Sequence, residues 1–170
     1  MTNPVNQMDQ AMKSMTIKTG KYLTFTLEDE TYGIGILKVK EIIGMMPITS
    51  VPQTPEFVKG VINLRGKVIP ILDLRLKFTM EAVPYSERTC IIVVEIESDE
   101  STVLIGVVVD AVSEVLNIRE EEIEPTPKFG TRLNTEHILG MAKMEGGVKI
   151  LLNIDQVLSA DEISSLGKVS

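Results

Sequence analysis

The residues best placed to do chemistry are two charges beside strongly apolar sequence, Glu41 and Arg65. An unpaired charge in such surroundings is costly, so the economical hypothesis is that the two side chains meet near the interface between the two halves of the fold. A planar guanidinium binds a carboxylate through two hydrogen bonds, which orients both groups more than it stabilises the fold. The alternative is that each charge is separately solvated. As a pair, they predict a device for orientation rather than a catalytic centre.

Other reactive groups are few. The sequence holds one histidine, His137, in a polar segment, and one cysteine, Cys90, which is expected to be a small buried hydrophobe in an apolar run. These counts exclude a disulfide framework and a His- or Cys-based metal cluster. Neither G-x-G-x-x-G nor a Walker sequence is present. Asp73 is most simply a helix cap, although a carboxylate pair for acid–base work stays open. We expect no cofactor, no metal and no enzyme activity.

Composition narrows the function further. The 170 residues carry a net charge of −7, only 4% are aromatic and none is Trp. An acidic surface opposes phosphate binding, and stacking platforms for bases or sugars are scarce. A small barrel that binds nucleic acid or oligosaccharide is therefore a weak alternative, and a hydrolase using Glu41 or Asp73 is weaker still. No stretch approaches the roughly 18 apolar residues of a membrane span, and a cytoplasmic protein is expected.

The element that must present Arg65 is a hairpin. Two aliphatic runs, 61–64 and 68–72, flank Arg65-Gly66-Lys67, and Gly66 can adopt the positive φ that a tight reversal requires. Runs this continuous are typical of strands that are buried on both faces. The pattern predicts that the hairpin is a rigid mount with Arg65 at its tip.

The chain also repeats itself. Six residues between Gly60 and Leu74 match six between Gly140 and Ile154 at an offset of 80, and seven between Gly33 and Ile43 match seven between Gly106 and Leu116 at an offset of 73. Ordered matches in glycines, apolar spacing and acids favour an internal duplication, although β-rich chains do reuse hairpin patterns. We predict an all-β fold of two small five-stranded barrels that share an aliphatic interface.

The domain prediction follows from these patterns. Residues 1–18 are expected to be a flexible tail, with a frayed amphipathic helix as the alternative, and residues 19–170 one domain. Its approximate halves are 19–80 and 88–155, with strands that can be exchanged between them. Apolar spacing predicts a C-terminal helix at 156–167, together with short helical turns elsewhere.

At this point the motifs become recognisable. The most specific is Asn63-Leu64-Arg65-Gly66; others are Pro70-Ile71-Leu72-Asp73-Leu74-Arg75 and Val112-Ser113-Glu114-Val115-Leu116. In this order, between residues 20 and 167, they resemble the CheW family of bacterial chemotaxis coupling proteins. The resemblance implies two SH3-like barrel subdomains and a non-catalytic adaptor. A CheW-like module of another chemosensory pathway is the alternative.

The resemblance also implies partners and a site. Such adaptors bind the cytoplasmic tips of methyl-accepting chemoreceptors and the regulatory domain of the histidine kinase CheA, in membrane-associated arrays. No nucleic acid or membrane insertion is implied, and the isolated chain is expected to be a monomer. By position, Glu41 and Arg65 fall on charges that matter for receptor binding and signalling. The remaining groove residues implied are Ile36, Val39, Ile48, Cys90, Gly106 and Val115. If Cys90 lines that groove, it is only partly buried. Kinase-facing residues are not assigned.

Overall fold

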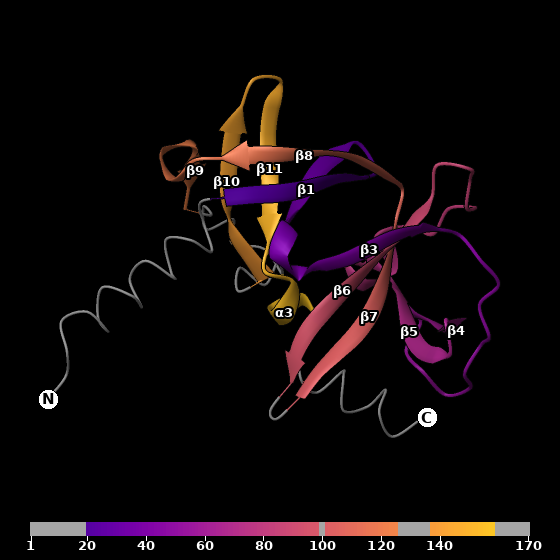
Figure 1. The fold of residues 1–170 in the computed structure, drawn as a ribbon. Helices are drawn as coiled ribbons and strands as arrows, with labels where there is room; N and C mark the ends of the chain where they lie inside the picture. Colours follow the sequence, from indigo (N-terminus) through magenta and orange to yellow (C-terminus); the bar gives the residue numbers. More distant parts are fainter. Residues whose placement is uncertain (1–19, 99–100, 126–136, 159–170) are drawn as a thin grey trace, which may run out of the picture.

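The computed structural model describes residues 20–98, 101–125 and 137–158, which form two β-sheets (Figure 1). The predicted tail, 1–18, and residues 159–167 of the predicted C-terminal helix lie outside these residues. In Figure 1 the strands of one sheet lie at the upper left and those of the other at the lower right, with α3 (Ile154–Val157) between them.

The first sheet, barrel A, has six strands. In spatial order they are β8 (Ala111–Ile118), β1 (Gly20–Leu27), β2 (Glu30–Gly35), β11 (Gly147–Leu152), β10 (Ile138–Met144) and β9 (Ile123–Glu124). The second sheet, barrel B, has five. They are β3 (Val39–Gly44), β6 (Cys90–Ser98), β7 (Ser101–Val109), β5 (Lys67–Asp73) and β4 (Val58–Leu64). Three further short helices are η1 (Ile36–Lys38), α2 (Leu74–Lys77) and η2 (Glu120–Glu122).

Each sheet closes on itself in the same way. In barrel B the chain leaves edge strand β3 and returns at Thr49, which exchanges two backbone hydrogen bonds of 2.9 Å with Val61 on the other edge strand, β4. In barrel A the chain leaves β8 and returns as β9, where Glu124 pairs with Met141 of β10. The all-β architecture of two small barrels is therefore as expected.

The two offsets seen in the sequence relate the strand pairings of one barrel to those of the other. The parallel pair Ile71↔Gly106 in barrel B corresponds to Leu151↔Gly33 in barrel A. Even the irregularities correspond, because the register shift between Val58 and Gly60 recurs between Ile138 and Gly140. An internal duplication explains both the sequence matches and these registers.

Neither half of the chain forms a barrel alone. Barrel A combines β1 and β2 with four strands from beyond residue 110, and barrel B combines β6 and β7 with β3, β4 and β5. The strands are thus exchanged between the halves 19–80 and 88–155. This exchange makes the chain cross between barrels twice, at η1 and at Asp110.

Three apolar cores follow from this arrangement. The largest, the seam core, lies between the barrels and takes residues from both sheets, such as Phe25 and Ile34 from barrel A and Ile92 and Val107 from barrel B. Each barrel also has a smaller interior core. Strands β6 and β7 contribute to two cores each, which explains their nearly continuous apolar sequence.

The hairpin at 58–73 forms as predicted, but its tip differs in two respects. Both loop residues have positive φ, +50° at Arg65 and +85° at Gly66, whereas only Gly66 was expected to. This is the backbone of a two-residue type I′ turn. The strands are also not buried throughout: Val68 is 65% exposed, in the part of β5 that pairs with β4 alone, because β7 pairs with β5 only from Ile71 onward.

Candidate protein-binding site

The structure brings Glu41 and Arg65 together. Glu41 lies on β3 and Arg65 at the β4–β5 tip, so the pair joins the two edges of the barrel B sheet. Nη1 of Arg65 donates to Oε2 of Glu41 at 2.6 Å, and Nη2 donates to Oε1 at 2.8 Å. Both oxygens of the carboxylate and both terminal nitrogens of the guanidinium take part in these hydrogen bonds, which fixes the relative orientation of the two groups.

This pair is more exposed than the sequence indicated. The side chain of Arg65 is 71% exposed and that of Glu41 29%, and both residues belong to barrel B rather than to the interface between barrels. The hydrogen bond from Arg65 holds the pKa of Glu41 below its ordinary value, and the bond to Glu41 raises the pKa of Arg65. Both groups are therefore charged at neutral pH, and the pair presents a fixed dipole to solvent.

The tip itself is held by a side chain. The N–H of Gly66 donates to Oδ1 of Asn63 at 2.9 Å, which satisfies a turn donor locally. The strained backbone at Arg65 is thereby retained in one conformation. The backbone position from which the Arg65 side chain extends is therefore fixed at the edge of the sheet.

The other predicted groove residues divide into three groups. Ile36, Val39 and Cys90 are partly buried and pack against the rim of the seam core. Cys90 is a free thiol at the start of β6, and its Sγ donates to the backbone oxygen of Arg88 at 3.3 Å. The partly open position matches the groove prediction for Cys90 better than the fully buried one.

Two further members of the set belong to the interior of barrel B. Ile48 packs against that interior core. Gly106 is buried on β7, where an added Cβ would lie 2.6 Å from Ile71 Cδ1 and 2.7 Å from Ile91 Cγ2. Gly106 therefore shapes the barrel without offering a side chain, whereas Ile48 is only partly buried and keeps part of its side chain open to solvent. Val115, in contrast, is 49% exposed on β8 of barrel A.

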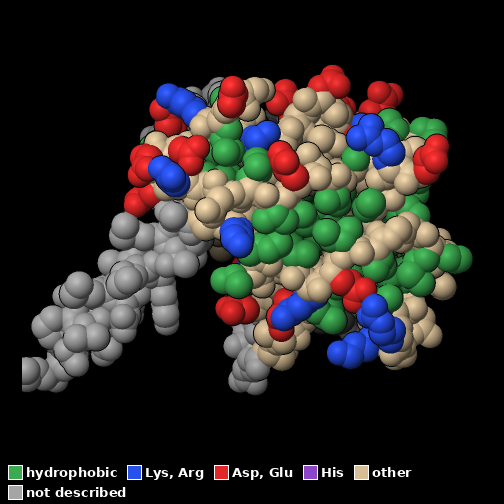
Figure 2. Space-filling model, turned by 45° about the horizontal axis from the view of Figure 1, so that its top comes forward, with side chains coloured by type: hydrophobic (Ala, Val, Ile, Leu, Met, Phe, Trp, Pro, Cys, Tyr) green, Lys and Arg blue, Asp and Glu red, His purple; other side chains and the backbone are tan. Residues whose placement is uncertain are grey.

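Sequence reasoning missed two exposed apolar residues near this site. Leu37 of η1 is 86% exposed and Ile42 of β3 is 44% exposed. Ile42 is the equivalent of Val115 at the offset of 73, so the repeat carried a signal that both edge strands present an apolar side chain. Figure 2 shows hydrophobic side chains gathered in the middle of one face of the molecule, with acidic and basic side chains around them. A surface of this kind is typical of protein recognition.

A charged cluster around Arg75 was also not anticipated. Arg75 of α2 makes two hydrogen bonds with Asp110, from Nε to Oδ1 at 2.7 Å and from Nη2 to Oδ2 at 2.6 Å. Beside it, Asp73 caps α2 as predicted, accepting from the N–H of Arg75 at 2.9 Å. The same carboxylate accepts from the hydroxyl of Tyr85 at 2.9 Å, and burial together with this bond raises the pKa of Tyr85.

A metal-binding cluster and a membrane-spanning helix are both absent from the described residues. Within them, no three His, Cys, Asp or Glu side chains gather closely enough to hold a metal ion. No helix in the same part of the chain is long and apolar enough to cross a membrane. The edge strand β3 carries both the carboxylate of an oriented ion pair and an exposed aliphatic side chain, Ile42, a combination suited to binding protein.

Comparison with known proteins supports this interpretation. The family model described as "CheW-like domain" matches residues 21–162. The chain belongs to the CheW-like family. It is 42% identical over 150 residues to the chemotaxis protein CheW of Klebsiella aerogenes, covering 88% of each chain. The chemotaxis protein CheW of Rhizobium meliloti is 34% identical, with 91% of this chain and 97% of that protein covered.

A solved structure extends the family assignment to the fold. The scaffolding protein TtCheW from Thermoanaerobacter tengcongensis has a TM-score of 0.75 to this CheW-like chain at 37% identity. The match covers 85% of this chain and 95% of that one. The two-barrel fold described above is therefore that of a CheW scaffold.

Proposed function

We propose that this chain is a non-catalytic scaffold of chemotaxis that couples methyl-accepting chemoreceptors to the histidine kinase CheA. Its curated relatives are named chemotaxis proteins, and its structural neighbour is titled a scaffolding protein. The observation in the structure that carries the proposal is the oriented Glu41–Arg65 pair at an edge of the barrel B sheet, whose edge strand β3 also carries the exposed Ile42. Geometry of this kind recognises a surface and needs no reacting group.

The receptor would be bound through the surface near β3. A receptor tip is helical, and a helix binds by laying an apolar stripe against apolar side chains while charges at the rim set its register. Val39, Ile42 and Leu37 supply apolar contact on the barrel B side, and Val115 supplies it from barrel A. Glu41 and Arg65 supply the rim charge. Cys90 and Ile36 contribute the partly buried floor.

Recruitment to membrane-associated arrays follows from this binding rather than from any segment of the described chain that enters the bilayer. Each interface would be of moderate size and moderate affinity. A scaffold that contacts receptor and kinase at once gains avidity from the array, since the second contact becomes intramolecular.

The direct test is a reconstitution of receptor fragment, CheA and this chain. We expect Arg65→Ala to lower receptor-stimulated kinase activity while its circular dichroism spectrum stays that of the wild type, because Arg65 is exposed at a turn. The matched control is Lys67→Ala, which removes an exposed cation from the same hairpin but leaves the pair with Glu41 intact. Stimulation that is equal in Arg65→Ala and the wild type would overturn the assigned role of this pair. A wild-type chain that pulls down neither receptor fragment nor kinase would overturn the function.

A further inference from the structure

Two clusters of charge bridge the barrels, and each lies where the chain crosses from one barrel to the other. The first crossing is η1, between β2 and β3, and the second is Asp110, between β7 and β8. Neither cluster includes Glu41 or Arg65. None of their residues was assigned to the binding surface described above.

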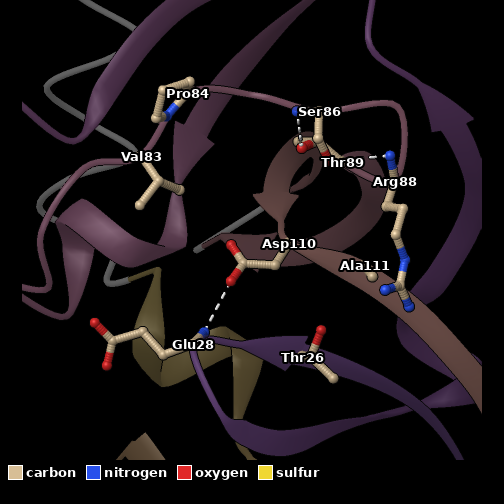
Figure 3. Close-up of a pocket in the computed structure, with 9 residues that line it drawn as sticks. All are labelled: Thr26, Glu28, Val83, Pro84, Ser86, Arg88, Thr89, Asp110 and Ala111. Carbon is tan, nitrogen blue, oxygen red and sulfur yellow. Dashed lines mark hydrogen bonds between the residues drawn. The ribbon is translucent and has the colours of Figure 1, made fainter.

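The cluster at the second crossing, the Arg75 clamp, is built on the carboxylate of Asp110. On the barrel B side, that carboxylate takes the two short hydrogen bonds from Arg75. On the barrel A side, its Oδ2 accepts the N–H of Glu28, in the β1–β2 turn, at 2.8 Å (Figure 3). The backbone N–H of Asp110 also donates to the oxygen of Thr26 on β1 at 3.1 Å. One aspartate therefore ties helix α2 of barrel B to the turn of barrel A.

The cluster at the first crossing, the Asp155 clamp, is built on a carboxylate of α3. Its Oδ2 lies 2.7 Å from Nζ of Lys38, the last residue of η1. Its Oδ1 accepts the N–H of Glu97 on β6 at 3.2 Å. Here a residue that follows barrel A's β11 is tied to a strand of barrel B.

The two clamps occupy related places in the duplicated fold, although their crossing residues are not equivalent, because Lys38 aligns with Ala111 at the offset of 73. Arg75 and Asp155 differ by the offset of 80, and each follows the last strand of its repeat. Glu28 and Glu97 are equivalent too, since the pairing Leu23↔Ile34 of β1 and β2 corresponds to Ile92↔Val107 of β6 and β7. In each clamp a carboxylate accepts an equivalent backbone N–H, that of Glu28 in one and that of Glu97 in the other. The positions of the acid and of the cation are reversed between the two clamps. The acid is on the crossing in one clamp and on the helix in the other.

The clamps differ in how strictly they define an angle. The Arg75 side chain is 12% exposed, and its third nitrogen also donates, to the backbone oxygen of Glu81 at 3.1 Å. A guanidinium with every nitrogen engaged has one orientation, whereas the Lys38 ammonium is a point charge, about one third exposed. The seam core between the barrels is mostly aliphatic, apart from the stacked rings of Phe25, Tyr32 and Phe78, and apolar packing of this kind gives adhesion with little direction. Polar contacts fix direction more strictly, and the Arg75 clamp is the stricter of the two.

We propose that Arg75, acting through Asp110, is a positioning residue that sets the angle between the barrels and thereby the shape of the partner-binding groove. The inference rests on the proposed function for its effect on binding, because the groove takes Val115 from barrel A and Ile42 from barrel B. The effect on the angle stands without it.

The clamp can be altered without sealing a charge inside the protein. Asp110 and Glu28 lie in the wall of an open pocket of about 290 Å³, which the segment from Val83 to Thr89 borders on its other side (Figure 3). Water can reach the group that a substitution leaves behind. We therefore expect Arg75→Met and Asp110→Asn to fold.

The angle between the barrels is followed by pulsed electron–electron double resonance, which measures the distance distribution between spin labels at the two hairpin tips. The exposed residues Lys67 and Glu145 are changed to cysteine in a common Cys90→Ala background. We expect one narrow distance distribution in the parent, and a shifted or broadened one after Arg75→Met. The matched control is Arg119→Met, which removes an exposed arginine whose ion pair with Glu121 stays within barrel A.

Binding is measured in parallel on the unlabelled full chain, with a receptor cytoplasmic fragment as the probe. We expect Arg75→Met to bind about three- to thirtyfold more weakly and Arg119→Met to bind like the parent. An unchanged distance distribution in folded Arg75→Met overturns the proposal. A changed distribution with unchanged affinity also overturns it, because the groove would then not depend on the angle. A parent that does not bind the fragment refutes the proposed function instead, and the distances still decide whether the clamp sets the angle.

The reversed polarity of the Asp155 clamp supplies a rescue experiment. Arg75→Asp combined with Asp110→Lys gives the first clamp the charge order of the second, with the acid on the helix and the cation on the crossing. We expect the double variant to recover a narrow distribution and part of the affinity that each single variant loses. No recovery relative to Arg75→Asp alone would contradict a direct role of this pair in the angle.

Discussion

Arg65 shows how one residue can meet two demands that conflict. The turn requires positive φ at this position, which a long side chain adopts only with strain, and the ion pair requires a guanidinium. Asn or Gly would suit the backbone better, since Asn-Gly is the preferred sequence of a type I′ turn. The presence of Arg therefore indicates that the side chain is kept for what it contacts rather than for the turn.

This conflict yields a variant that separates stability from binding. Arg65→Asn should preserve or slightly raise the melting temperature, because Asn tolerates the left-handed region and the exposed ion pair adds little to stability. We expect the same variant to lower receptor-stimulated kinase activity to the same extent as Arg65→Ala. Thermal unfolding followed by circular dichroism tests the first part and the reconstituted kinase assay the second. A fall of several degrees in melting temperature would show that the pair with Glu41 stabilises the hairpin more than its exposure indicates.

The Glu41–Arg65 pair was predictable because each charge lies next to strongly apolar sequence, where an unpaired charge is costly. The Arg75–Asp110 pair was not predictable from the sequence. Asp110 has an ordinary position at the end of a strand, and Arg75 is the second residue of a short helix. They meet only because the chain crosses between barrels at Asp110, and the partner of a crossing residue is fixed by how the strands are exchanged.

At the scale of elements, the repeat revealed which strands exist and which residues align, but not which barrel they join. Exchanged and unexchanged barrels contain the same strands with the same apolar faces. The choice depends on whether η1 and Asp110 are short crossings or hairpin turns, and their sequences do not distinguish the two. The exposure of Leu37 was also not predicted. This residue lies in the crossing η1, and an apolar residue in a helical turn is ordinarily assigned to a core.

Closure of barrel B depends on one glycine. An added Cβ at Gly60 would lie 2.0 Å from the backbone oxygen of Thr49, and its φ of +141° is unsuited to other residues. Gly60→Ala must push away the segment that bridges β3 to β4, including Ile48. We expect it to lower the free energy of unfolding by about 2–4 kcal/mol, measured by urea denaturation.

The control for that variant lies on the same barrel. Gly44 on β3 has no atom within 4 Å of an added Cβ, so Gly44→Ala should change stability by about 1 kcal/mol or less. Equal effects of the two substitutions would mean that barrel B tolerates opening at the Thr49–Val61 bridge. Such a result would also weaken the argument that β3, and Glu41 with it, is held rigidly.

At the scale of the whole molecule, the seam core and the clamps join the barrels into one unit, and this union should depend on pH. Burial raises the pKa of Asp110, but the hydrogen bonds from Arg75 and from the N–H of Glu28 outweigh it and hold the pKa below its ordinary value of 3.8. The unfolded chain therefore binds a proton more readily than the folded one. The stability that the clamp contributes is complete above pH 3.8 and is lost as the pH falls through the lower, folded pKa.

The pH dependence separates charge from packing in the clamp. At pH 7, Asp110→Asn should unfold at lower urea, with a loss of about 1–3 kcal/mol, less than for a fully buried pair because the clamp is partly solvated. The difference from the wild type should then shrink as the pH is lowered below the ordinary aspartate value, since the wild type loses its charge as well. Glu121→Gln, at an exposed pair, should track the wild type throughout. A difference between Asp110→Asn and the wild type that stayed constant into acid would mean that the carboxylate holds the barrels by shape and not by its charge.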